Sequence, residues 1–200
     1  VEEATCLPVT ITSAGYASFY APVEVTLPNG VCAYYITLEG VNDGYVSLTI
    51  IEDGIIPANT GVILTAENPA TYNLIISNTG IANVKGNLLK GTAATTYISE
   101  KAYVLSNKNG SVGLYLAEMN QNNDTAFINN SHKAYLPASI LPSGLQGTSR
   151  LSFVLGETTA IEKVKSDAVK VKSIYDLAGR RINTTTRGIY ITNGKKLIIK

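Results

Sequence analysis

The chain has 200 residues, of which 45% are apolar and only 16% charged, a composition typical of globular proteins and sufficient for a sandwich with an appendage or two small domains. Val, Ile, Thr and Tyr are frequent, whereas the Ala-Leu-Glu-Lys periodicity of long helices is missing. This composition argues against a helical bundle and predicts an all-β chain. No stretch is long and apolar enough to suggest a membrane span.

Charge is distributed unevenly, although the net charge is only +1. Residues 1–156 contain 6 Lys and Arg against 11 Asp and Glu, a net charge of −5. Residues 157–200 contain 10 against 4, a net charge of +6. We expect the two parts to attract each other and pack together. A basic tail that meets an anionic cell-surface polymer or nucleic acid is the alternative, and we expect no nucleic-acid partner.

Cys6 and Cys32 are the only cysteines. In an exported protein they permit one disulfide, which would close a loop of about 25 residues and contribute roughly 3 kcal/mol. Two buried free thiols that behave as small hydrophobic groups are the alternative. The sequence leaves both arrangements open.

Short strand candidates separated by turn signals recur along the first three quarters of the chain. The candidates are Pro8–Thr12, Tyr16–Tyr20, Val23–Leu27, Val31–Glu39, Tyr45–Ile51, Gly61–Ala66, Thr71–Ile76, Tyr103–Ser106, Val112–Glu118, Lys133–Leu136 and Leu151–Leu155. Between them, Asn-Gly and Asp-Gly pairs supply the positive φ that tight hairpins need. Many short strands at this spacing predict an antiparallel β-sandwich, or a barrel-like sandwich.

The sequence predicts two parts joined by a linker. Residues 1–156 would form the sandwich, residues 157–168 a polar linker and residues 169–200 a small C-terminal β-appendage. The appendage offers about four strands, too few to be stable alone, so we expect it to dock on the first part.

A hairpin is predicted within the appendage. The pair Asn193-Gly194 separates two strand-like runs, Gly188–Thr192 and Lys195–Ile199. Because Asn and Gly tolerate left-handed backbone conformations, they favour a two-residue turn between these runs.

Motifs in both parts resemble one group of proteins. Residues 174–181 read IYDLAGRR and residues 188–196 read GIYITNGKK, a pattern that resembles the C-terminal tails, related to sorting domains, of secreted and surface proteins of Bacteroidetes bacteria. Residues 15–23 (GYASFYAPV), 56–64 (IPANTGVIL) and 133–137 (KAYLP) resemble a module common near the C-termini of Bacteroides surface proteins. The tail is about half as long as a full sorting domain.

The resemblance implies a location and a context. Such modules follow adhesin, lectin-like or glycoside-hydrolase domains and have no assigned activity of their own. We therefore expect an extracellular or outer-membrane-surface location and an upstream domain of the same polypeptide as a partner. The resemblance also implies Thr125, within Asp124-Thr125-Ala126, as a candidate site of O-glycosylation. An ordinary Asx turn at Asp124 is the alternative.

The residues offer little for catalysis. The single histidine, His132, approaches a strand without a nucleophile motif nearby, which predicts a surface histidine. The acidic residues fall in turns or, like Glu24 and Glu39, at outward strand positions, where nothing raises a carboxyl pKa for acid catalysis. We expect neither enzymatic activity nor a cofactor.

Metal binding is not expected either. One histidine and two separated cysteines cannot readily provide a zinc site. Residues 120–124 (NQNND) offer oxygen ligands for calcium but lack the spacing of an EF-hand loop, so a plain polar loop is the expected reading.

Carbohydrate binding is the competing hypothesis, because the chain has 12 Tyr, although it has no Trp. The candidate glycan contacts are Tyr35, Tyr45 and Tyr115, with the Asn-rich loop 120–130. The tyrosines of the resembling motifs are predicted to lie in the core with their hydroxyls satisfied: Tyr16, Tyr20 and Tyr135. The sequence thus predicts a non-catalytic structural or adhesion module that ends a larger surface or secreted protein and that contacts a cell-surface glycan or protein. A carbohydrate-binding module of a glycan-processing protein is the alternative.

Overall fold

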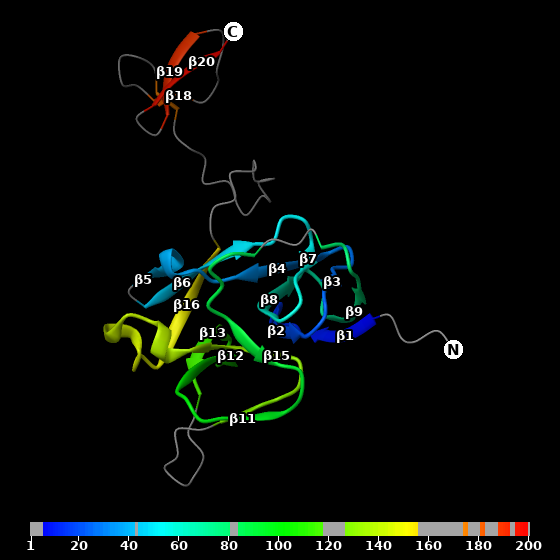
Figure 1. Cartoon of the computed structure of the whole chain (residues 1–200). Coiled ribbons are helices and arrows are strands. Elements are labelled where there is room, and N and C mark those ends of the chain that lie inside the picture. The colour runs from blue at the N-terminus through cyan, green and yellow to red at the C-terminus, as the bar shows by residue number, and fades with distance from the viewer. Residues whose placement is uncertain are drawn as a thin grey trace. The chain divides into compact units, whose positions relative to one another are not determined.

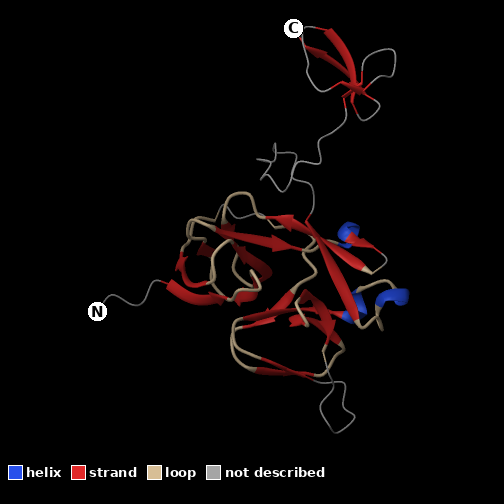
Figure 2. Ribbon diagram, turned by 180° about the vertical axis from the view of Figure 1, so that it is seen from behind, coloured by secondary structure: helices blue, strands red, loops and turns tan. Residues whose placement is uncertain are grey.

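The computed structural model describes residues 6–42, 44–80, 84–117 and 127–155, and the backbone of four strands between residues 174 and 199. As predicted, the chain is all-β. The helices in the described part are three single 3₁₀ turns, Leu38–Gly40, Ala138–Ile140 and Ser143–Leu145 (Figure 2). None of these described helices has the length and apolar character required to cross a membrane.

The chain forms two compact units, Val1–Thr158 and Thr159–Lys200 (Figure 1). The strands described in the first unit are β1 (Cys6–Ile11), β2 (Tyr16–Ala21), β3 (Val25–Thr26), β4 (Val31–Tyr35), β5 (Val41–Asn42), β6 (Tyr45–Ile50), β7 (Ile55–Ile56), β8 (Thr60–Ala66), β9 (Ala70–Ile76), β10 (Lys90–Thr92), β11 (Thr96–Ile98), β12 (Ala102–Lys108), β13 (Ser111–Leu116), β14 (Phe127–Asn129), β15 (Lys133–Pro137) and β16 (Arg150–Leu155).

Three sheets contain these strands. A four-stranded sheet has the order β1-β9-β3-β7, and a long sheet has the order β10-β15-β12-β13-β16-β6-β4-β8-β2, with β5 paired to β6. Strands β11 and β14 form a separate two-stranded ribbon. The pairing is antiparallel except between β16 and β6, which run parallel. The first unit is therefore a sandwich in which one sheet is much longer than the other.

Strand β8 separates two hydrophobic cores. Val62 and Leu64 point into the core shared with the four-stranded sheet, which also contains Ile11 and Phe19. Ile63, between them, points into a second core around Leu114, Leu136 and Leu151. Successive side chains of a strand face opposite sides, so a strand between two cores must be apolar at every position. The continuous run Gly61–Leu64 meets this requirement.

The long sheet curls back on itself, because β10 and β15 at one end contact β2 and β8 at the other. Figure 1 shows β15 beside β2 and β8. Two glycines permit this closure. A Cβ on Gly91 would lie 2.4 Å from the Cβ of Tyr20, and one on Gly61 would lie 2.8 Å from the carbonyl oxygen of Lys90. The resulting sheet is a nearly closed barrel.

The second unit contains β17 (Ile174–Tyr175), β18 (Arg181–Ile182), β19 (Gly188–Thr192) and β20 (Lys195–Ile199), in the order β18-β17-β19-β20. Thr192 is opposite Lys195 in the antiparallel β19–β20 pair. The antiparallel pairing of the two predicted runs is therefore confirmed, whereas the predicted turn residues Asn193 and Gly194 lie outside the described residues. The predicted docking of residues 169–200 on the first part stays a prediction.

Candidate functional site

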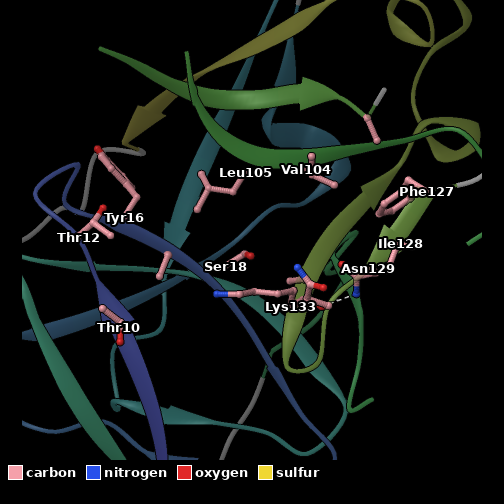
Figure 3. A pocket seen from close by; sticks show the side chains of 14 residues that line it. Thr10, Thr12, Tyr16, Ser18, Val104, Leu105, Phe127, Ile128, Asn129 and Lys133 are labelled. Carbon is pink, nitrogen blue, oxygen red and sulfur yellow. Dashed lines mark hydrogen bonds between the residues drawn. The ribbon is translucent and has the colours of Figure 1, made fainter. Parts of the chain in front are cut away.

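A pocket of about 660 Å³ lies beside the closure of the long sheet, a size in the range of small-molecule sites. Strands β1 and β2 form one wall, and β12, β14 and β15 form the other. The lining residues are Thr10, Thr12, Tyr16, Ala17, Ser18, Val104, Leu105, Ala117, Phe127, Ile128, Asn129, Asn130, Lys133 and Ala134 (Figure 3). Hydroxyl, amide and ammonium groups thus share this space with aliphatic and aromatic side chains.

A tight turn places Lys133 in the pocket. The Lys133 amide donates to the Asn130 carbonyl, and His132 has a φ of 55°, a left-handed conformation between the two. The Asn129 side chain, 3% exposed, donates from Nδ2 to the Lys133 carbonyl oxygen at 2.9 Å and to Thr92 Oγ1 at 2.9 Å. These bonds satisfy a buried amide and fix the backbone from which the Lys133 side chain extends.

His132 connects this turn to β2 through hydrogen bonds. Its Nδ1 donates to the carbonyl oxygen of Tyr20 at 3.0 Å, and its own carbonyl oxygen accepts from the Tyr20 amide at 3.1 Å. The imidazole also stacks on Phe19, with ring centroids 6.4 Å apart. The prediction that His132 lies on the surface is therefore wrong. His132 is half-buried, because its left-handed backbone turns the ring onto β2.

Lys133 is the only charged side chain among the described residues that line the pocket. Figure 3 shows it extending across the pocket from the Asn129 side toward Ser18, which is 7% exposed. Partial burial lowers the pKa of the Lys133 ammonium below the 10.5 of an ordinary lysine, because the charged form loses hydration there. The described walls offer no carboxylate in return.

Packing holds the aromatic rings of the pocket in place. Tyr16 contacts Phe153, with ring centroids 5.6 Å apart, and Phe127 meets Tyr135 edge to face at 5.7 Å. Tyr135 is buried as predicted, and the Tyr20 hydroxyl donates to Asn59 Oδ1 at 3.0 Å. Tyr16, predicted for the core, instead lies half-buried at the pocket wall.

None of the three predicted glycan contacts lines this pocket. Tyr35 packs against the first core, and Tyr45 is 37% exposed at the start of β6. The ring of Tyr115 lies 5.3 Å from Lys108 Nζ and 5.6 Å from Arg150 Cζ, and its hydroxyl donates to the Ser111 carbonyl. These tyrosines therefore lie on β4, β6 and β13, outside the pocket. Of the predicted loop 120–130, residues 127–130 do line the pocket, and residues 118–126 lie outside the described part.

The disulfide between Cys6 and Cys32 is not formed, because both thiols are free. Cys6 is in β1 of the four-stranded sheet and Cys32 in β4 of the long sheet. Val31 and Ala33, on either side of Cys32, face the core, so Cys32 points outward. Cys6 lies on the same face of β1 as the exposed Pro8 and Thr10. The two thiols thus point away from the core that separates their sheets.

The remaining candidates can be placed only in part. Thr125 and the oxygen-rich residues 120–124 lie outside the described part of the chain. Within the described part, no group of three or more His, Cys, Asp or Glu side chains could hold a metal ion.

Sequence reasoning missed Lys133 and Ser18 as pocket residues, whereas Asn129 belongs to the predicted loop 120–130. Ser18 meets Asn129 and Lys133 only through the closure of the long sheet. The available signal was a lysine at the start of an otherwise apolar strand, three residues after the pair Asn129-Asn130. Comparison with known proteins adds no candidate residue, since no family model, curated protein or solved structure matches the chain.

Proposed function

We propose that this protein is a non-catalytic adhesion module of an extracellular or cell-surface protein, and that it binds its ligand in the pocket beside β2 and β15. The resemblance of both parts of the sequence to bacterial surface proteins supports the location. The pocket supports a binding role that is more specific than spacing or display of an upstream domain.

The observation that carries this proposal is the composition of the pocket. Its described walls combine hydroxyls, amides and two aromatic rings in about 660 Å³. Such a mixture gives a ligand both apolar contact and directed hydrogen bonds, which are the usual components of a small-molecule site.

The same walls are better suited to binding than to hydrolysis. A serine–lysine pair would be the nearest approach to a nucleophile and base, and activation of the serine requires a hydrogen bond between the two. The polar groups of the pocket can in any case serve recognition of a ligand, which is the role proposed here for Ser18 and Lys133.

The second candidate function, a carbohydrate-binding module of a glycan-processing protein, is favoured by the same polar and aromatic walls. Sugars present hydroxyl edges and apolar ring faces, and Asn130 and the Thr and Ser hydroxyls can bond the first while Phe127 packs on the second. The two functions differ in the parent protein, not in the chemistry of the pocket.

Binding to a glycan array by the whole chain tests the proposal. Phe127→Ala and Ile128→Ala remove pocket wall, and Ile128 is 61% exposed, so its substitution leaves the cores intact. Tyr45→Ala is the matched control, an exposed residue outside the pocket. We expect both pocket variants to lose retention and the control to keep it. Absence of any bound glycan, or binding insensitive to both pocket variants, would contradict a pocket-based function.

A further inference from the structure

The pocket contains an ammonium group with no anionic counterpart among the described residues. Lys133 forms no ion pair with any described residue, in contrast to Lys90, which lies 3.7 Å from Glu100. The other described residues of the walls are neutral. An anion that enters the pocket therefore meets a fixed positive charge with no competing carboxylate on the described walls.

Partial burial makes this charge selective. A lysine that has given up part of its hydration regains favourable interaction only when an anion or strong acceptor replaces the lost water. A neutral ligand would leave this loss uncompensated. Charge-assisted hydrogen bonds are also about twice as strong as neutral ones. The pocket should thus distinguish an acidic ligand from a neutral ligand of the same shape.

The surrounding walls indicate which class of molecule bears the anionic group. A fatty acid would require a continuous apolar wall, but hydroxyls of Thr10, Thr12 and Ser18 interrupt the apolar surface. The amide of Asn130 adds a group that both donates and accepts. Such walls fit a ligand with many hydroxyls and a single carboxylate.

We propose that the pocket binds an acidic sugar, a hexuronic acid unit of a polysaccharide, with its carboxylate on the Lys133 ammonium and its ring against Phe127. This inference rests on the proposed binding function of the pocket. It names the class of ligand and the residue that selects it.

A matched pair of ligands tests this assignment by calorimetry on the whole chain. The probes are short oligomers of galacturonic acid and of glucuronic acid, each compared with its own methyl ester, which keeps the sugar and removes the charge. We expect at least one acid to bind about tenfold to a hundredfold more tightly than its ester. We expect Lys133→Gln to remove that difference, whereas Lys85→Gln, at an exposed position outside the pocket, retains it.

Each of the following outcomes would overturn the inference. Equal binding of acid and ester, or an unchanged ratio in Lys133→Gln with an unaltered melting temperature, would show that Lys133 does not select charge. Acetate that binds as tightly as the uronic acid oligomers would show a bare anion site without sugar recognition. Pocket-dependent binding of neutral glycans alone would leave the proposed function standing and remove the acidic ligand. If no glycan binds at all, both proposals fail.

Discussion

Glu24 shows how one half-buried polar side chain can organise a segment that is distant in sequence. Its carboxylate accepts hydrogen bonds from the Thr79 amide at 2.6 Å, the Thr79 hydroxyl at 2.9 Å, the Ser77 hydroxyl at 3.1 Å and the Gly80 amide at 3.2 Å. The sequence predicted Glu24 at an outward position of a strand Val23–Leu27, but β3 contains only Val25 and Thr26, and Glu24 lies just before it. Its role depends on residues more than fifty positions away, which no local pattern could reveal.

These bonds predict a pH dependence. Chiefly the Thr79 amide lowers the pKa of the Glu24 carboxyl below its usual 4.5, because the bonds favour the charged form. A pKa lower in the folded state means that stabilisation is present above pH 4.5 and is lost as the pH falls through the lower folded value. The protection of the Thr79 and Gly80 amides, measured as hydrogen exchange relative to the intrinsic rate at each pH, should therefore fall on acidification. Glu24→Gln should show fast exchange at neutral pH, and protection unchanged in that variant would contradict the assignment.

Tyr103 is a buried polar group of the second core. Its ring is fully buried, and its hydroxyl donates to the carbonyl oxygens of Leu145 and Thr148. Tyr103→Phe leaves these acceptors without that donor, so we expect a loss of about 1–2 kcal/mol in the free energy of unfolding. Denaturant titration measures it. Tyr45→Phe, at an exposed position, is the control and should change stability by less than about 0.5 kcal/mol.

Closure of the long sheet depends on glycines in two strands. Gly91→Ala in β10 would place its Cβ 2.4 Å from the Cβ of Tyr20, a backbone-anchored atom that cannot move aside freely. We expect a loss of about 1–3 kcal/mol in unfolding free energy, the usual cost of overpacking. Gly144→Ala is the matched control, since nothing lies within 4 Å of its added Cβ. Equal stability of the two variants would show that β10 does not close against β2.

Most longer strands could be predicted from the sequence because they carry their own signal. Tyr16–Tyr20 and Tyr45–Ile51 match β2 and β6 to within a residue. The strands β7, β10, β11 and β14 were missed because each has only two or three residues, and pairing with distant strands, not local pattern, defines them. The predicted strand Val31–Glu39 is too long, since the chain leaves β4 at Tyr35 and turns into a 3₁₀ helix.

The pocket could not be predicted from the sequence for the same physical reason. Ser18 lies more than a hundred residues before Asn129 and Lys133, and contacts between β2 and β15 bring them to one pocket, so each residue type alone is uninformative. Tyr35, Tyr45 and Tyr115 were chosen as glycan contacts because aromatic residues mark binding surfaces. In the structure, Tyr35 packs against the first core, and Lys108 and Arg150 lie over the ring of Tyr115.

At the scale of the whole molecule, the sequence predicts cooperation between two units of opposite charge. The second unit has four short strands, too few to bury a stable core alone. We expect residues 159–200 produced alone to show no cooperative thermal melt, and the complete chain to show one. A cooperative melt of the isolated segment would contradict this dependence.

The central claim is that a surface module of this architecture binds an acidic ligand in the pocket beside Lys133. Its most direct test is backbone amide NMR of the whole chain during titration with a uronic acid oligomer. If the ligand binds in the pocket, we expect chemical-shift changes concentrated at Ser18, Asn130 and Lys133. We expect little change at Tyr35, Tyr45 and Tyr115. Shifts confined to those three tyrosines, or no saturable shift anywhere, would contradict it.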